Sequence, residues 1–249
     1  MIKHYKFKTK PYAHQLEALE KSWAAETYAL FMEMGTGKSK VLVDNIAVLY
    51  DKGAIRGALI VAPKGVYKNW DQIEFPVHLP DHVNHTKVLW EPNITKKKQA
   101  ELDTLFDGKE DLKILIMNVE AFSTTKGLDF AHSFLNIFLG RALIGIDEST
   151  TIKSPTAKRT KNILKIGELA KYRRILTGSP VTKSPLDLYT QCKFLDPYHL
   201  DEDSYYAFRA RYSNMVKRNF GGRSVQLVVS YRRLDELAKK LEKFSYRVL

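Results

Sequence analysis

Four short runs that are apolar along most of their length constrain the fold of this chain more than any other feature. They are residues 27–32, 57–62, 113–117 and 142–146, and residues 173–177 are a further candidate strand. A strand with one face in water alternates polar and apolar residues, whereas an unbroken apolar run indicates a strand covered on both faces. Stretches with helical spacing, such as 38–50 and 95–106, separate these runs. The pattern predicts an α/β fold with a mostly parallel sheet flanked by helices.

Composition narrows the class of protein. The chain has 249 residues, of which 44% are hydrophobic and 27% charged, so wholesale disorder is excluded. No apolar run approaches the roughly 18 residues that span a bilayer, and residues 1–10 lack the apolar centre of a signal peptide. The single cysteine, Cys192, excludes an internal disulfide and a Cys-rich zinc site. We expect a soluble protein of the cytoplasm, nucleoid or nucleus, without a membrane partner.

The order of elements changes after Pro197. A Tyr-rich helix over 204–212, a turn at Gly221-Gly222, a strand over 225–229 and an amphipathic helix over 234–244 are expected there. These do not continue the alternation of strand and helix. We therefore expect a main domain over 1–200 and a small C-terminal helix/strand appendage of the same lobe over 201–249.

The segment Gly35-Thr36-Gly37-Lys38-Ser39 lies between a predicted strand and a predicted helix. Glycines there let backbone N–H groups converge on phosphate oxygens at the positive end of the helix dipole. Lys38 would reach the β- and γ-phosphates, and the Ser39 hydroxyl would bind Mg²⁺. Met32 stands where the general pattern has its first glycine. A glycine turn with a solvated lysine stays open as the alternative.

Asp147-Glu148 follows the predicted strand 142–146 directly. A carboxylate at the C-terminal end of a buried strand, beside a phosphate loop, is suited to hold Mg²⁺. The next carboxylate is suited to orient and deprotonate an attacking water. Together with the loop, the pair predicts hydrolysis of a nucleotide with Mg²⁺, with Lys38, Asp147 and Glu148 as the catalytic residues.

The positive charge is concentrated in one segment. The formal net charge is +12, and residues 151–183 hold nine basic residues against one acid, Glu168. Such clustering suits a polyanionic partner, because each neutralised phosphate releases a counterion. A solvated helix face would look the same. The basic residues that carry most of the excess are Lys153, Lys158, Arg159, Lys161, Lys165, Lys171, Arg173 and Arg174.

Several motifs, in order along the chain, resemble the first RecA-like lobe of superfamily 2 helicase-like ATPases, and most closely the Swi/Snf type of double-stranded DNA translocase. Residues 12–17 are similar to the first motif of that family, and residues 33–39 resemble its phosphate loop, which also lacks the early glycine. Residues 59–63 with Asn69-Trp70 resemble its DNA-contacting segment, and Asp147-Glu148 falls on its Asp-Glu box. Residues 174–181 give the strongest match.

The resemblance implies a RecA-like P-loop domain that binds ATP and Mg²⁺ and moves on double-stranded DNA without sequence preference. In the family the glutamine of the first motif, here Gln15, reads adenine. The implied nucleotide-binding residues are Gln15, Met34, Gly35, Thr36, Gly37, Lys38 and Ser39, with Ser39 and Asp147 on the metal. Residues that couple the nucleotide state to movement between lobes fall on Thr177, Gly178 and Ser179. The DNA-binding candidates are Lys64, Asn69, Lys153, Lys158, Arg159 and Lys161.

The chain departs from the family in two ways. Ser149 and Thr150 replace the usual Ala-His after the Asp-Glu pair. The sequence ends at Leu249, where the second RecA-like lobe of the family would begin, so we expect little or no activity without a second lobe, in cis or in trans. Two other functions stay open: a stand-alone P-loop ATPase or kinase, and a non-catalytic module that binds nucleic acid or protein.

Overall fold

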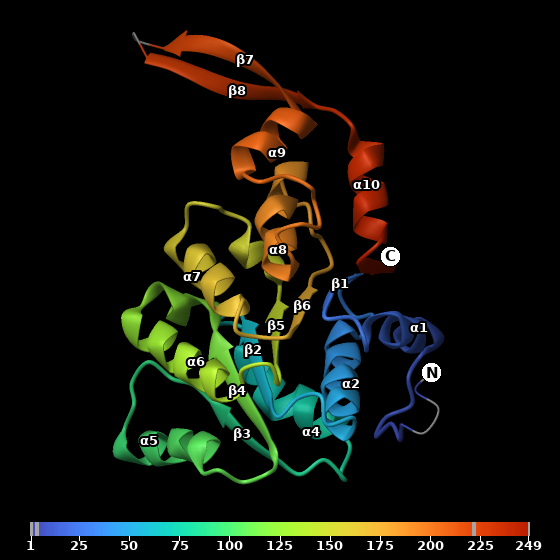
Figure 1. Ribbon diagram of the computed structural model, residues 1–249, viewed down its shortest axis with the longest axis vertical. Coiled ribbons are helices and arrows are strands. Elements are labelled where there is room, and N and C mark those ends of the chain that lie inside the picture. The colour runs from blue at the N-terminus through green and yellow to red at the C-terminus, as the bar shows by residue number, and fades with distance from the viewer. Residues whose placement is uncertain (1, 3–4, 221–222, 249) are drawn as a thin grey trace.

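A seven-stranded sheet forms the centre of the computed structural model, which describes residues 2, 5–220 and 223–248 (Figure 1). All six pairings between neighbouring strands are parallel. The predicted α/β class with a parallel sheet is therefore confirmed. In spatial order the strands are β3 (His85–Leu89), β4 (Leu112–Asn118), β2 (Gly57–Ala62), β5 (Ala142–Asp147), β6 (Tyr172–Leu176), β1 (Thr27–Met32) and β9 (Ser245–Val248).

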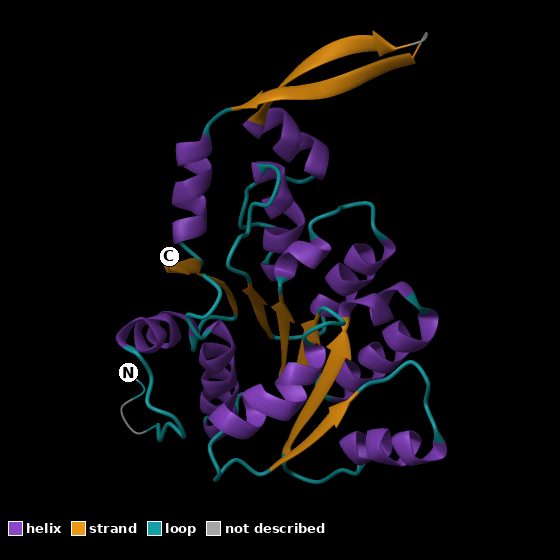
Figure 2. Cartoon of the chain, turned by 180° about the vertical axis from the view of Figure 1, so that it is seen from behind, coloured by secondary structure: helices purple, strands orange, loops and turns teal. Residues whose placement is uncertain are grey.

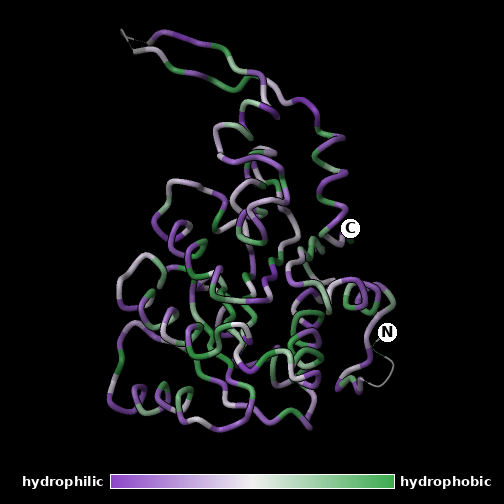
Figure 3. The backbone as a smooth tube through the Cα atoms, in the orientation of Figure 1, coloured by the Kyte–Doolittle hydropathy of each residue, from purple (hydrophilic) through white to green (hydrophobic). Residues whose placement is uncertain are grey.

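Helices cover both faces of this sheet (Figure 2). Every residue of β2, β4 and β5 is buried, as the unbroken apolar runs predict. Successive residues of a strand enter different clusters: Ala58 and Ile60 belong to one hydrophobic core, and Leu59 and Val61 to the other. In Figure 3 the hydrophobic colour accordingly concentrates in the interior of the main body.

The helices divide between these two cores. One core is completed by α1 (Ala13–Ser22), α2 (Lys38–Asp51), α3 (Tyr67–Asn69), the π-helical turn η1 (Trp70–Glu74) and α4 (Phe75–His78). The other is completed by α5 (Lys96–Asp103), α6 (Thr125–Ile137), α7 (Lys158–Gly167) and α8 (Leu188–Leu195). Short 3-10 turns are η2 (Thr104–Phe106), η3 (Val119–Ser123), η4 (Ser149–Ile152) and η5 (Pro185–Asp187). Among the described residues, no helix has the length and apolar character needed to cross a bilayer.

The C-terminal segment only partly stands outside the sheet. Helix α9 (Tyr205–Tyr212) leads into β7 (Ser213–Phe220), which pairs antiparallel with β8 (Arg223–Tyr231). This hairpin extends away from the body in Figure 1, and α10 (Leu234–Glu242) leads back. The last strand, β9, then pairs with β1 in the main sheet. Strands β7 and β9 were not expected, and the predicted turn at Gly221-Gly222 lies outside the described residues. The division at residue 200 stays a prediction, but β9 belongs to the sheet rather than to an appendage.

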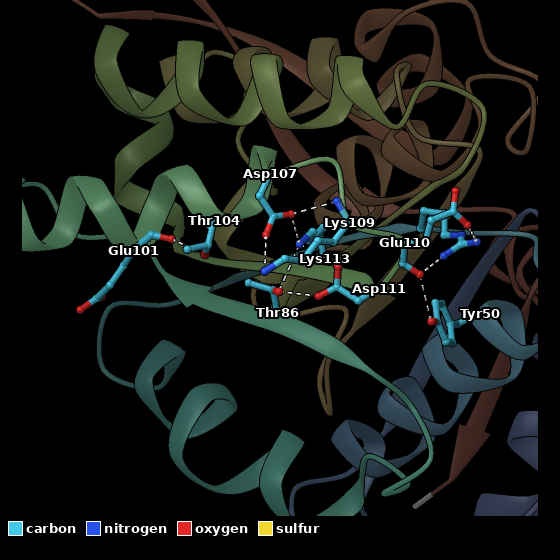
Figure 4. Close-up of polar contacts among 10 residues, drawn as sticks. Tyr50, Thr86, Glu101, Thr104, Asp107, Lys109, Glu110, Asp111 and Lys113 are labelled. Atoms are coloured by element: carbon cyan, nitrogen blue, oxygen red, sulfur yellow. Dashed lines mark hydrogen bonds and ion pairs between the residues drawn. The ribbon is translucent and has the colours of Figure 1, made fainter.

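A partly buried ion cluster lies at the start of β4, at the end of the sheet opposite the phosphate loop (Figure 4). Lys113 is only 1% exposed, and its Nζ lies 2.7 Å from Asp107 Oδ1 and 2.7 Å from Asp111 Oδ1. The hydrogen bond from Lys113 is the largest of the causes that lower the pKa of Asp107 to about 2. A run that begins with lysine thus still enters the core, because two carboxylates neutralise the cation.

Candidate nucleotide-binding site

The candidate site lies where three neighbouring strands end. Strands β5, β6 and β1 are adjacent in the sheet, and they are followed by Glu148, Thr177 and the loop 33–37 respectively. The sheet is parallel, so the C-terminal ends of these strands meet at one edge. Ligands of open α/β sheets bind at this edge.

The phosphate loop has the backbone that its glycines predict. Gly35 and Gly37 have φ of 83° and 82°, in the left-handed region that favours glycine. Gly37 caps the 14-residue helix α2, so the free N–H groups of the first turn face the loop. A side chain at Gly37 would also collide with Gln15, because its Cβ would lie 2.2 Å from Gln15 Nε2.

Two residues of α1 hold this loop from the side. Gln15 Nε2 donates to the Thr36 carbonyl at 2.9 Å, and Gln15 Oε1 accepts from the Tyr12 N–H at 3.0 Å. His14 also places its Nε2 2.8 Å from the same carbonyl. In this conformation the Gln15 amide is engaged with protein on both ends. A pocket of about 490 Å³ beside it is lined by Thr9, Lys10, Pro11, Tyr12, Gln15, Gly37, Lys40 and His78, where a base would fit.

The predicted catalytic and coupling residues meet at the other end of the loop. Lys38 Nζ lies 3.6 Å from Glu148 Oε1, and the Thr177 hydroxyl donates to Glu148 Oε2 at 3.2 Å. The Ser179 N–H in turn donates to the Thr177 hydroxyl at 3.2 Å. A smaller pocket, of about 280 Å³, is lined by Glu33, Met34, Lys38, Glu148, Gly178 and Ser179.

Gly178 brings the coupling segment against the phosphate loop. A Cβ at this position would lie 3.3 Å from Glu33 Cα and 3.3 Å from the backbone nitrogen of Met34. Residue 178 therefore has little room for a side chain, and the segment Thr177–Ser179 packs closely against the start of the loop. The structure brings the residues predicted from three separate motifs into contact.

Asp147 is a buried carboxylate with both oxygens bonded. It is 7% exposed; Oδ1 accepts from the Glu148 N–H at 3.0 Å, and Oδ2 accepts from Trp70 Nε1 at 2.9 Å. Burial is the largest cause that raises the pKa of Asp147, and the neighbouring charge of Glu148 adds to it. Glu148 itself has φ of 47°, a conformation that costs a non-glycine residue about 1–3 kcal/mol and is concentrated at functional sites.

The polar side chains at this site suit Mg²⁺ better than a metal that is held by three or more protein side chains. The described residues contain no group of three or more His, Cys, Asp or Glu side chains placed to hold a metal. Mg²⁺ is usually bound by one or two carboxylates together with water and substrate phosphates. Asp147 supplies such a carboxylate, and the half-buried Ser39 lies in the first turn of α2, beside the phosphate loop. Bound Mg²⁺ would supply the positive charge that polarises a phosphate.

Sequence reasoning missed two side chains at this site. Trp70, which the sequence places only in the segment that resembles a DNA-contacting motif, is buried, and its indole N–H donates to Asp147. Glu74, one turn further on, is half-buried, and burial followed by the charge of Asp147 raises its pKa. A tryptophan at apolar spacing carries no signal for such a bond, because the partner lies 77 residues away in the sequence.

Ser149, which replaces the alanine of the Asp-Glu box, is also accounted for. It is 0% exposed, and its hydroxyl donates to Gln191 Oε1 at 2.6 Å. Gln191 Nε2 then donates to the carbonyls of Pro180 and Asp187, each at 2.8 Å. The serine therefore links the end of β5 to the segment that follows Ser179.

The candidate DNA-binding residues differ in availability. Lys64, Asn69, Lys158 and Lys161 are exposed. Lys153 Nζ lies 3.7 Å from Asp187 Oδ2, and Arg159 Nε donates to the Thr151 carbonyl at 3.0 Å, so these two also hold loops.

The basic cluster of the second half needs one correction. Arg174 is fully buried, so it is unable to contact a polyanion as part of a surface. Its neighbour Arg173 is half-buried. Strand β6 places both side chains within or against the body, which reduces the surface charge that the count of basic residues suggests.

The fold and the site define an α/β P-loop domain of the RecA-like type. The chain matches the SNF2-related domain over residues 14–248, and it belongs to that family.

Relatives and solved structures agree with this assignment. The chain is 26% identical over 222 residues to Protein CHROMATIN REMODELING 24 of Arabidopsis thaliana, with 86% of this chain and 19% of that protein covered. It is 27% identical over 230 residues to the SWI/SNF-related matrix-associated actin-dependent regulator of chromatin subfamily A containing DEAD/H box 1A of Danio rerio, with 85% of this chain and 22% of that protein covered. The chain thus spans less than a quarter of either relative.

Two solved structures share the fold. The Sulfolobus solfataricus SWI2/SNF2 ATPase core, solved in complex with dsDNA, superposes with a TM-score of 0.68 at 20% identity, covering 98% of this chain and 45% of that one. The UvsW helicase from bacteriophage T4 gives a TM-score of 0.53 at 13% identity, covering 75% and 58%. At these identities the likeness establishes the architecture of the lobe.

Proposed function

We propose that this chain is the ATP-binding first lobe of a Swi/Snf-like translocase, which couples ATP hydrolysis to movement on double-stranded DNA. The observation that carries the proposal is the pair of contacts that Glu148 makes. Its carboxylate lies 3.6 Å from Lys38 Nζ and accepts a hydrogen bond from the Thr177 hydroxyl at 3.2 Å, which joins the phosphate loop, the Asp-Glu box and the coupling segment. Lys38 and the first turn of α2 would bind the phosphates. Glu148 would hold the attacking water and take its proton, once phosphate draws Lys38 away from it.

Binding of a fluorescent ATP analogue tests the site. We expect Lys38→Ala to lose binding by at least tenfold, because a buried ammonium that pairs with phosphate is removed. Lys52→Ala is the matched control, since Lys52 is exposed at the C-terminal end of the same helix. Equal affinity in the Lys38→Ala protein and the wild type would remove the assigned site.

We infer further that DNA binds by its phosphates, without sequence preference. The exposed Lys64, Asn69, Lys158 and Lys161 support this, as does the basic excess of the segment 151–183. A role on DNA would place the protein in the cytoplasm, the nucleoid or the nucleus.

Full turnover requires a second RecA-like lobe in this proposal, either in cis or in trans. The support is that the chain corresponds to 45% of the Sulfolobus ATPase core. Steady-state hydrolysis, measured with and without duplex DNA, separates the alternatives. ATP binding without turnover agrees with half of a motor, whereas turnover that is independent of DNA would favour a stand-alone ATPase or kinase.

A further inference from the structure

Trp70 makes a specific contact with the carboxylate proposed to bind the metal. It is 1% exposed, and its indole Nε1 donates to Asp147 Oδ2 at 2.9 Å. The other oxygen, Oδ1, accepts from the Glu148 N–H. The two donors fix the plane of the carboxylate, while each oxygen keeps a lone pair for a ligand.

Burial alone does not explain this bond. Trp90 is buried to nearly the same extent, at 2% exposure, and its indole nitrogen has no hydrogen-bond partner among the described residues. The fold therefore accommodates a tryptophan whose N–H is unsatisfied. At Trp70 the N–H instead meets an acidic side chain from β5, the strand that leads into the candidate site.

The backbone around Trp70 connects this contact to a second surface. Residues 63–69 form consecutive turns, in which the N–H groups of Val66 and Tyr67 bond the Pro63 carbonyl at 2.9 Å and the Asn69 N–H bonds the Val66 carbonyl at 2.9 Å. Helix α3 then passes without a break into η1, which begins at Trp70. Turns of π-helix are rare, and many of those that occur lie at functional sites. The segment with the exposed Lys64 and Asn69 thus ends in the donor to Asp147.

We propose that Trp70 is a positioning residue that holds the Asp147 carboxylate in its metal-binding orientation and links that orientation to the seating of residues 63–69. The inference rests on the proposed function, since it needs Mg²⁺ and nucleotide at this site and DNA at the loop. A ligand that moves the loop displaces the indole, and the carboxylate loses or regains one of its two fixed donors. Outer partners of metal ligands commonly contribute about 10- to 100-fold to metal affinity.

The test compares Trp70→Phe with Trp90→Phe. Both changes remove a buried indole, but only the first removes a hydrogen bond. The affinity for a fluorescent ATP analogue is measured in EDTA and in saturating Mg²⁺, and thermal unfolding checks that the two variants fold alike. We expect both variants to bind the analogue with unchanged affinity in EDTA. In Trp70→Phe, we expect the gain in affinity on adding Mg²⁺ to be about one tenth of the wild-type gain, or smaller.

The outcomes separate the inference from the function on which it rests. If the wild type binds no nucleotide, the proposed function falls and this inference falls with it. If the wild type binds but the gain from Mg²⁺ is the same in Trp70→Phe, the positioning role alone is overturned. A Trp70→Phe protein that binds more weakly to the same extent with and without metal also overturns it, since that result indicates a packing role.

A second measurement addresses the link to residues 63–69. A mixed-sequence DNA duplex is added, and the gain in nucleotide affinity from Mg²⁺ is measured again. We expect the duplex to change this gain at least threefold in the wild type and in Trp90→Phe, and to leave it unchanged in Trp70→Phe. A duplex that binds all three proteins and changes the gain equally in each would overturn the link.

Discussion

Asp147 lies at a position where the ionised form of a carboxylate is disfavoured. Both of its oxygens accept hydrogen bonds, but the side chain is buried and lies next to the carboxylate of Glu148. Burial raises its pKa, which means that the folded state disfavours the ionised form that a metal needs. In the absence of a cation, this residue therefore lowers the stability of the protein at neutral pH.

The change Asp147→Asn is expected to remove the response of nucleotide binding to Mg²⁺ and to remove the dependence of stability on pH that the raised pKa of Asp147 causes. The folded-state pKa of Asp147 lies above the unfolded value of about 3.9, so wild-type stability falls, relative to the variant, as pH rises between these two values. Each unit of elevation is worth about 1.4 kcal/mol. Thermal unfolding from pH 4 to 8 measures this, with the exposed Asp129→Asn as control. A difference in unfolding midpoint between the wild type and Asp147→Asn that stays constant from pH 4 to 8 would contradict this expectation.

At the scale of elements, the buried strands were predictable and their polar contacts were not. A central parallel strand is apolar whichever helices cover it, so β2, β4 and β5 follow from the apolar runs of the sequence. Strand β7 contains Lys217, Arg218 and Asn219 and gives no such signal. Strand β9 has four residues, and its position is determined by pairing with β1. The two strands are more than 200 residues apart in the sequence.

The site shows the same division. The phosphate loop and the Asp-Glu pair were predictable, because each depends on a local strand-to-turn or strand-to-helix geometry. The bond from Trp70 to Asp147 was not, because it depends on how residues 77 positions apart are brought together. The burial of Arg174 was missed for a related reason: a count of charges does not reveal which side of a strand faces the core.

We predict that helix α7 contacts DNA. Its Lys158 and Lys161 are exposed and three positions apart, so they lie on one face. The double change Lys158→Ala/Lys161→Ala should weaken binding to duplexes of any sequence and reduce the slope of log affinity against log salt by roughly 2.

The matched control for α7 is Lys96→Ala/Lys97→Ala. It removes the same charge from two exposed lysines of α5. The affinity of a labelled duplex is measured by anisotropy from 50 to 200 mM salt. Should both double variants change the slope equally, the effect would be one of net charge and α7 would not be a contact surface.

At the scale of the whole molecule, one buried cation ties several elements together. Arg174, on β6, is 0% exposed and has no carboxylate among its hydrogen-bond acceptors. Burial lowers the pKa of its guanidinium to about 9, which leaves it charged at neutral pH. Its acceptors are Asn45 Oδ1 and the backbone carbonyls of Ser22, Ala25, Glu26 and Arg173, at 2.6–3.0 Å.

These contacts join the end of α1, the start of β1, the middle of α2 and β6, the elements around the phosphate loop. The change Arg174→Met should lower the free energy of unfolding by about 2–4 kcal/mol, because buried acceptors left without donors cost about 1–3 kcal/mol each, while removal of a buried charge offsets part of that loss. Lys171→Met, which removes an exposed cation 4.0 Å from Glu26, is the control and should change stability by less than about 0.5 kcal/mol. Urea unfolding measures both. If Arg174→Met proved as stable as the wild type, the guanidinium would not be what holds α1 and α2 to the sheet.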